Sequence, residues 1–173
     1  MFYQTLVTLP TLRMKALLSL LEKVKIQASE KGIDDATLLE YRLAPDMLPF
    51  ARQIQIVSDN AKWMASRMAW VEAPKYEDNE KTLDELMTRL EKTIAYIATF
   101  TEESFQNAKN AEARFSWFPG KKMVGEGYVF TYGLPNFFFH VVTAYDILRH
   151  NGFQIGKSDY IGDEIALLDD TDS

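Results

Sequence analysis

Apolar residues recur at steps of three and four along four separate stretches of the chain, which is the period of amphipathic helices. The first stretch covers about residues 2–31 and ends at Gly32, because glycine tolerates the left-handed geometry of a helix C-terminus. The second begins near Pro49, a residue suited to the first turn of a helix. Its apolar stripe is the most regular of the four: Met47, Phe50, Ile54, Val57, Ala61, Met64 and Met68. Such a stripe is typical of helices packed in a bundle.

The third and fourth helices are marked by signals at their ends. Thr82 followed by Glu85 predicts a capping box, and the third helix is expected to run from there to about Phe105. The fourth helix is expected to open at Leu134 and to stop at Gly152. Its predicted stripe consists of Phe138, Val141, Tyr145 and Leu148.

Shorter elements complete the prediction. Asp34 can cap a helical turn that extends to Tyr41. Aromatic and β-branched residues at 113–118 and 128–132 flank a Pro-Gly turn, which predicts a short β-hairpin or extended flap resting on the bundle. A segment from Asp159 to Leu167 is expected to pack back on it. We therefore predict an all-α fold: a four-helix bundle in a single domain of residues 1–168, followed by an acidic disordered tail at 169–173.

Composition and charge exclude several classes of protein. The chain has 173 residues, of which 47% are hydrophobic and none is cysteine, so disulfides, thiolate nucleophiles and cysteine-bound metals are excluded. The net charge of −6 and the scattered basic residues argue against a nucleic-acid partner. Arg13 and Lys15 interrupt the N-terminal apolar pattern, and no stretch reaches the roughly 18 apolar residues of a membrane span. We expect a cytoplasmic protein with no membrane partner.

The candidate chemistry lies on the predicted fourth helix. The chain has two histidines, His140 and His150, which are about 15 Å apart along that helix and therefore cannot share one metal. Asn136 lies one turn before His140, on the same face. His140 can belong to a polar pocket inside the bundle, or it can be a core histidine satisfied by a single hydrogen bond. His150 is interpreted as a cation at the helix C-terminus.

Polar residues on the second predicted helix are candidates for the same site. Asp46, Gln53 and Asn60 recur every seven residues beside the apolar stripe, from where they could point toward His140. Gln55 is a further candidate on this helix. A solvated helix flank would show the same pattern.

Phe137, Phe138 and Phe139 occupy three consecutive helix positions, which fan out over about 200°. At least one of them must therefore leave the core of the bundle, and we expect a homodimer interface in this region. No complete catalytic motif accompanies these features, since the chain has neither a Glu-x-x-His pair nor a G-x-S-x-G elbow.

Several segments resemble an uncharacterised bacterial family of the DinB-like (DinB/YfiT) superfamily, over nearly the whole chain. They are Arg42–Met47, Gln53–Gln55, Leu134–His140, Ala144–Tyr145, Leu148–Gly152, Gly156–Lys157 and Asp159–Gly162. The resemblance implies a DinB-like four-helix bundle that is often dimeric. Many members hold a divalent metal, commonly nickel or zinc, with one histidine from the second helix and two from the fourth. Some catalyse thiol-dependent transfers.

This sequence departs from the three-histidine pattern. By the resemblance, the ligands fall on His140, on Asn136, and on Gln53 or Gln55, so one imidazole is kept and two are replaced by amides. Neutral amides are poor ligands for nickel or zinc, although they can still hydrogen-bond a small molecule. We therefore expect no metal and no other cofactor. The predicted function is the binding of a small polar or thiol-bearing ligand, or of a partner, with contacts from His140, Asn136, Gln53, Gln55 and Asp46.

Two alternatives stay open. One is a divalent-metal-dependent transferase or hydrolase of the DinB/YfiT type that uses His140 with Asp46 or water. The other is a structural or interaction protein that acts through a dimer surface near Phe137–Phe139. The sequence names no catalytic residue and leaves open whether the protein is an enzyme.

Overall fold

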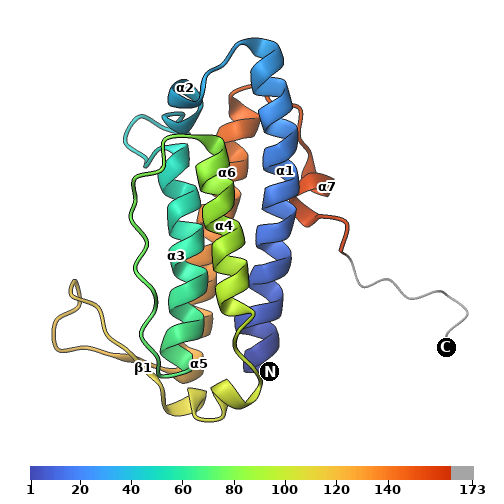
Figure 1. Ribbon diagram of the computed structural model, residues 1–173. Helices are drawn as coiled ribbons and strands as arrows, with labels where there is room; N and C mark the ends of the chain where they lie inside the picture. Colours follow the sequence, from blue (N-terminus) through green and yellow to red (C-terminus); the bar gives the residue numbers. More distant parts are fainter. Residues whose placement is uncertain (165–173) are drawn as a thin grey trace, which may run out of the picture.

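The computed structural model describes residues 1–164, which form a bundle of four long helices (Figure 1). The all-α four-helix bundle predicted from the sequence is confirmed. The long helices are α1 (Leu9–Lys31), α3 (Phe50–Met68), α4 (Leu83–Ile97) and α6 (Leu134–His150). A π-helical turn, η1 (Gln4–Thr8), leads into α1. The short helix α2 (Asp35–Leu39) buries Leu38 and Leu39 in the core, whereas α7 (Lys157–Ile161) has no fully buried residue. The tail predicted at 169–173 and the end of the segment predicted up to Leu167 lie outside the described residues.

The helix ends follow the local signals in the sequence. Gly32 terminates α1 with a φ of 65°, and its N–H donates to the carbonyls of Ala28 and Ser29. Asp34 caps α2 by accepting a hydrogen bond from the N–H of Thr37. Thr82 and Glu85 form both bonds of the predicted capping box at the start of α4. Because the caps at Asp34 and at Thr82 satisfy N–H groups that have no partner inside the helix, they fix where α2 and α4 begin.

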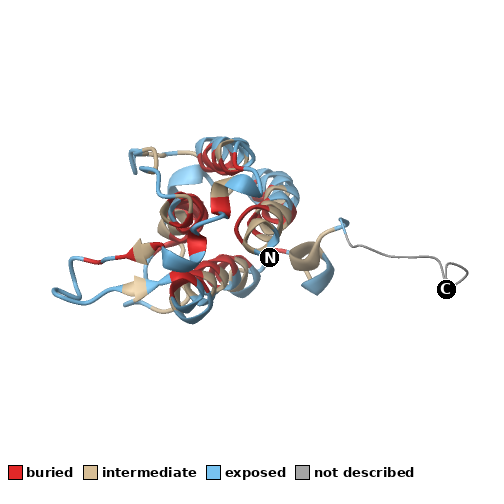
Figure 2. Cartoon of the chain, turned by 90° about the horizontal axis from the view of Figure 1, so that it is seen from below, coloured by how far each residue is buried: buried red, intermediate tan, exposed pale blue. Residues whose placement is uncertain are grey.

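The apolar stripes face one another across the bundle, and Figure 2 shows the buried residues on the inner sides of the helices. On α3, the residues from Phe50 to Met68 of the predicted stripe are fully buried, whereas Met47 is half-buried in the preceding loop. On α6 the buried face is rotated from the predicted one. It consists of Phe137, His140, Val141, Thr143, Ala144, Ile147 and Leu148, while Phe138 and Tyr145 are only half-buried. Apolar residues surround most of α6, so their spacing did not single out one face.

The predicted end of the third helix at about Phe105 is wrong, since α4 ends at Ile97. The chain then forms two 3₁₀ turns, η2 (Glu103–Phe105) and η3 (Ala108–Asn110). Thr99 Oγ1 donates to the carbonyl of Tyr96, and Ser104 Oγ accepts from the N–H of Thr101. Such side-chain bonds to the backbone compete with helical bonds and favour turns.

The predicted hairpin is present but short: of the first predicted arm, 113–118, only Ala113 lies in a strand, and the second arm was placed wrongly. Strand β1 (Glu112–Ala113) pairs antiparallel with β2 (Met123–Val124), with Glu112 opposite Val124. The residues 128–132, predicted as extended, belong instead to α5 (Gly125–Tyr128) and to a π-helical turn, η4 (Val129–Gly133), that leads directly into α6. Tyr128 and Val129 are buried in the core. Packing at this position overrides the strand preference of aromatic and β-branched residues.

The antiparallel pair α3 and α6 provides the setting for the candidate site. Figure 1 shows α3 descending and α6 returning behind it. Gly133 lies where η4 meets α6, and a Cβ at this position would be 2.7 Å from Met64 Sδ. The glycine therefore allows the two helices to approach closely. Within residues 1–164, no helix combines the length and apolar character needed to cross a bilayer.

Candidate functional site

His140 and Gln53 form a hydrogen-bonded pair between α6 and α3. The Nδ1 atom of His140 lies 2.6 Å from Oε1 of Gln53. Gln53 Nε2 donates to the carbonyl of Leu48 at 2.9 Å, so the amide oxygen is the atom that faces the imidazole. An amide oxygen can only accept, and His140 Nδ1 therefore carries the proton. The lone pair is consequently on His140 Nε2.

The surroundings of His140 keep its imidazole neutral. Its side chain is buried, with the residue 8% exposed, and this desolvation lowers the pKa of His140 to about 4. A base with such a low pKa is a poor proton acceptor at neutral pH. Its Nε2 atom makes no hydrogen bond with any residue in 1–164, and it remains a neutral hydrogen-bond acceptor.

A second polar pair lies two turns further along α3. Asn136 Nδ2 donates to Asn60 Oδ1 at 3.1 Å, again joining α6 to α3. The Nδ2 atom of Asn60 is buried and has no hydrogen-bond partner among the described residues. A buried amide donor without a partner is destabilising and rare in folded proteins. The two facing helices thus present one free acceptor, His140 Nε2, and one free donor, Asn60 Nδ2.

The structure brings together only part of the predicted set. His140 and Gln53 meet, and Asn136 meets Asn60 instead of Gln53. Gln55 is buried on another side of α3, where its Nε2 donates to Glu80 Oε2 at 2.7 Å. Two positions along a helix turn a side chain by about 200°, which separates Gln55 from Gln53.

Asp46 is likewise separated from the polar pairs. It is exposed in the loop before α3. Since α3 begins at Phe50, the seven-residue spacing from Asp46 to Gln53 does not describe one helix face.

Sequence reasoning missed the largest buried ionic cluster. Arg89 of α4 is 4% exposed, and its guanidinium lies 2.9 Å from Asp59 Oδ1 and 2.8 Å from Glu80 Oε1. It also donates to Ser58 Oγ at 3.2 Å. The sequence did carry a signal, because Arg89 follows Leu86 by three positions and therefore falls within the apolar stripe of α4. A charged side chain on the core-facing side of a helix needs buried partners, because an unpaired buried charge is strongly destabilising.

The residues at this position do not fit a three-histidine metal site. Among residues 1–164, no group of three or more His, Asp or Glu side chains is placed to hold a metal ion. Beside His140 the remaining donors are amides, and Gln53 already uses both of its amide atoms within the protein. One imidazole with neutral amides is a weak donor set for nickel or zinc.

Comparison with known proteins agrees with this architecture. Residues 2–161 match the model of a domain family of unknown function, DUF1993. A crystal structure described as a DinB family member protein from Shewanella denitrificans is 36% identical in sequence, with a TM-score of 0.89. The similarity covers 93% of this chain and 92% of that one. No curated protein matches the chain.

The fold and the extent of these matches define a helical bundle of the DinB-like class. Within that class, the chain belongs to the uncharacterised family DUF1993.

Proposed function

We propose that this protein binds a small polar or thiol-bearing molecule between α3 and α6, without a resident metal. The observation that carries the proposal is the pair of free polar atoms, His140 Nε2 and Asn60 Nδ2, on facing helices. A ligand with an O–H, N–H or S–H group would donate to His140, and its acceptor atom would satisfy Asn60. Gln53 and Asn136 hold these two side chains in place.

Because His140 is neutral, the proposed interaction is a hydrogen bond and not an ion pair. With the pKa of His140 lowered to about 4, the acceptor lone pair persists at all pH values well above that. Binding should therefore be unchanged between pH 8 and roughly pH 5, and should weaken as the imidazole is protonated near pH 4. A site that used an ordinary histidine would weaken near pH 6.5 instead.

The test is a nuclear magnetic resonance titration of ¹⁵N-labelled protein with glutathione, cysteine and serine as probes. We expect a saturable shift of the His140 Nε2 signal with at least one probe, and no shift of His150. His140→Phe should abolish binding, whereas the matched variant His150→Phe, at the exposed end of α6, should keep it. The proposal fails if no probe moves His140, or if the His140 variant binds as well as the original protein.

The metal-free part of the proposal has its own test. Nickel, zinc and manganese are added to protein purified without a histidine tag, and the Tm is measured. We expect no stabilisation, because ligands that bind only the folded state raise the Tm and this donor set is weak. Stoichiometric metal binding that disappears in His140→Phe would favour the metal-dependent transferase or hydrolase instead.

A second candidate function is self-association through the outer face of α6. Phe139 is 54% exposed and Val142 is 40% exposed, and they are three positions apart, so both lie on one face of the helix. We propose that this face joins two copies of the chain. Light scattering at micromolar concentration should show a dimer that Phe139→Glu converts to a monomer. Phe118→Glu, at an exposed position in the hairpin turn, is the matched control. A monomeric unmodified protein would overturn this candidate.

A further inference from the structure

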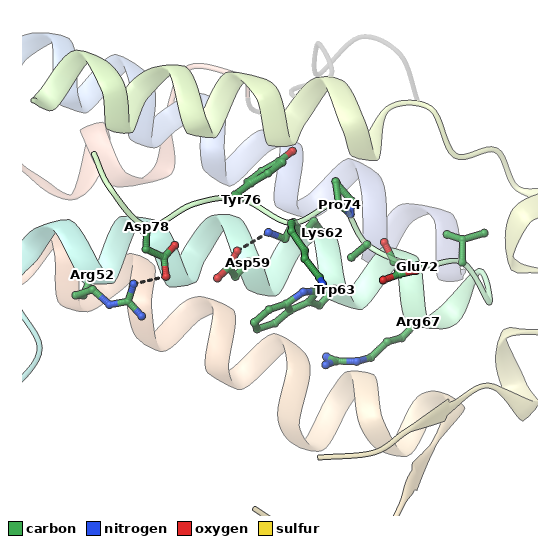
Figure 3. Close-up of a pocket in the computed structure, with 13 residues that line it drawn as sticks. Arg52, Asp59, Lys62, Trp63, Arg67, Glu72, Pro74, Tyr76 and Asp78 are labelled. Carbon is green, nitrogen blue, oxygen red and sulfur yellow. Dashed lines mark hydrogen bonds and ion pairs between the residues drawn. The ribbon is translucent and has the colours of Figure 1, made fainter. Parts of the chain in front are cut away.

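A hollow of about 580 Å³ lies between α3 and the segment 71–78 that returns along it (Figure 3). Its volume is within the range of sites that hold small molecules. The α3 residues that line it include Asp59, Lys62 and Ser66, which lie on a different face of the helix from Gln53 and Asn60, and Arg67, which lies two turns beyond Asn60. None of the residues in the polar pairs at His140 lines the hollow. The hollow is therefore separate from the polar pairs at His140.

The return segment is directed by an unusual helix end. Trp70 follows the last turn of α3 with a φ of 59°, in the left-handed region that side chains rarely adopt. The N–H of Trp70 donates to Arg67 O, and the N–H of Val71 donates to Ser66 O at 3.0 Å. These two bonds are a Schellman motif, which reverses the chain. Figure 1 shows the segment that follows running back beside α3.

Two cations of the hollow are already neutralised. Lys62 is 2% exposed, and its Nζ lies 2.6 Å from Asp59 Oδ1. Arg52 lies 2.6 Å from Asp78 Oδ2. Because these buried or half-buried charges are already paired, they interact only weakly with a charged ligand.

Arg67 is different, because it makes no ion pair with any carboxylate in residues 1–164. Its guanidinium carbon lies 5.3 Å from the ring centre of Trp63, 5.0 Å from that of Phe115 and 5.6 Å from that of Tyr128. One N–H donates to the hydroxyl of Tyr128 at 2.9 Å. The rings hold the planar group in place, and its other N–H donors keep the fork geometry that suits a carboxylate or phosphate.

Trp63 supplies a flat apolar wall beside this cation. It is 37% exposed, and Figure 3 shows its indole ring between Lys62 and Arg67. The lining contains four basic residues, Arg52, Lys62, Arg67 and Lys75, and three acidic residues, Asp59, Glu72 and Asp78. The hollow thus has a local surplus of one positive charge, in a chain whose net charge is −6.

We propose that this hollow is a binding site for a small planar molecule that carries a carboxylate or phosphate group. Arg67 binds the oxyanion through its free N–H donors, and the planar part stacks on Trp63. Because Arg67 is immobilised before the ligand arrives, little side-chain freedom is lost on binding.

Four simple probes test the proposal on the unmodified protein: phenyl phosphate, benzoate, inorganic phosphate and benzamide. The indole N–H resonance of Trp63 reports binding. We expect phenyl phosphate or benzoate to bind saturably, and uncharged benzamide and inorganic phosphate each to bind about tenfold more weakly or worse. The stronger of the two aromatic anions identifies phosphate or carboxylate as the recognised group. If neither binds, or if benzamide binds equally well, the proposal is wrong.

Variants test the two named residues. Arg67→Gln should weaken the aromatic anion by about tenfold or more, since it loses a charged donor. Arg114→Gln, which removes an exposed arginine outside the hollow, should leave binding unchanged. If Arg67→Gln does not fold, Trp63→Leu is used instead. The indole ring of Trp63 is partly exposed, so its loss should disturb the fold less. Trp63→Leu should reduce phenyl phosphate binding to the level of inorganic phosphate, and an undiminished aromatic preference would contradict the proposal.

Discussion

At the scale of single residues, the fixed orientation of one amide determines the chemistry of His140. Leu48 O binds the amide nitrogen of Gln53, so the amide oxygen must face His140 Nδ1. The imidazole then has its lone pair on Nε2, and its burial opposes protonation. The residue is consequently suited to accept a hydrogen bond and poorly suited to act as a general base at neutral pH.

Burial of His140 should make the free energy of unfolding depend on pH. The pKa is about 4 in the folded protein and about 6.5 when unfolded, so the unfolded chain binds the proton more tightly. The contribution of the neutral imidazole is complete above pH 6.5 and is lost as pH falls toward 4. At pH 4.5 the loss should reach roughly 2.5 kcal/mol relative to neutral pH. Urea unfolding at a series of pH values measures it.

The control for this prediction is a pair of histidine variants. His140→Gln should remove this part of the pH dependence, while His150→Gln, at an exposed position, should retain it. The free energies of unfolding of the original protein and of His140→Gln are compared between about pH 4.5 and 6.5. If both depend on pH with the same slope, burial does not lower the pKa of His140 and the prediction is wrong.

Arg89 should contribute to stability through the charges that it neutralises. Its side chain is 3% exposed and lies within 3.0 Å of Asp59, Asp78 and Glu80. Arg89→Met would leave carboxylates partly unpaired in a buried site, and we expect unfolding to require about 3–5 kcal/mol less free energy. Urea denaturation followed by circular dichroism is the measurement.

Arg114→Met is the matched control for Arg89. The Arg114 side chain is 62% exposed and pairs with Glu112 at the surface, so its loss should change stability by no more than about 1 kcal/mol. Equal losses in the two variants would mean that burial does not strengthen the Arg89 cluster.

At the scale of elements, close packing between α3 and α6 depends on Gly133. An added Cβ would lie 2.7 Å from Met64 Sδ and 2.9 Å from Met64 Cγ. Gly133→Ala must therefore displace a fully buried methionine, and we expect a loss of about 1–3 kcal/mol in the free energy of unfolding.

Gly127 offers a nearby comparison in the same helical segment. A Cβ there would meet nothing within 4 Å, so Gly127→Ala should be neutral or stabilise by up to about 1 kcal/mol. Thermal unfolding of both variants separates the two effects. A similar change in both would show that helix propensity, and not contact with Met64, decides the outcome at Gly133.

The elements that the sequence predicted correctly are those defined by nearby residues. Asp34 and the pair Thr82 and Glu85 act within three positions of themselves, so their caps could be recognised from the sequence. The end of α4 could not, because Phe100 and Phe105 stay buried after the helix has ended. Apolar spacing reports burial and does not distinguish a helix from compact turns that are also buried.

For the candidate site, too, the sequence predicted what depends on nearby residues and not what depends on packing between helices. His140 and Asn136 share a face of one helix, and Gln53 and Asn60 share a face of another, so their alignment followed from spacing. Which residues pair depends on the register between α3 and α6, which is a tertiary property. For that reason the sequence could not show that Asn136 forms its hydrogen bond with Asn60, or that Asn60 Nδ2 has no partner in the described residues.

At the scale of the whole molecule, the segment after α6 returns along the bundle to α1. Gly152 reverses the chain with a φ of 84°, and Phe153 and Ile155 then insert into the core, where they are 0% and 4% exposed. The backbone N–H and carbonyl of Gln154 both bond to the side-chain amide of Gln27 on α1. Beyond them α7 packs on α1 without burying any residue completely. We therefore expect the inserted part, Phe153 to Ile155, to contribute more to the free energy of unfolding than the outer part, α7.

Two shortened chains should separate these parts. A chain ending after Gly156 loses α7 with its half-buried Tyr160 and the surface pair Lys23–Asp159, and it should unfold with about 1–2 kcal/mol less free energy. A chain ending after Asn151 also loses Phe153 and Ile155, and we expect a further loss of about 4–6 kcal/mol. Urea unfolding of both chains beside the full protein gives the two steps. Equal first and second losses would mean that α7 stabilises the bundle as much as the two core side chains do, and this division of the segment would be wrong.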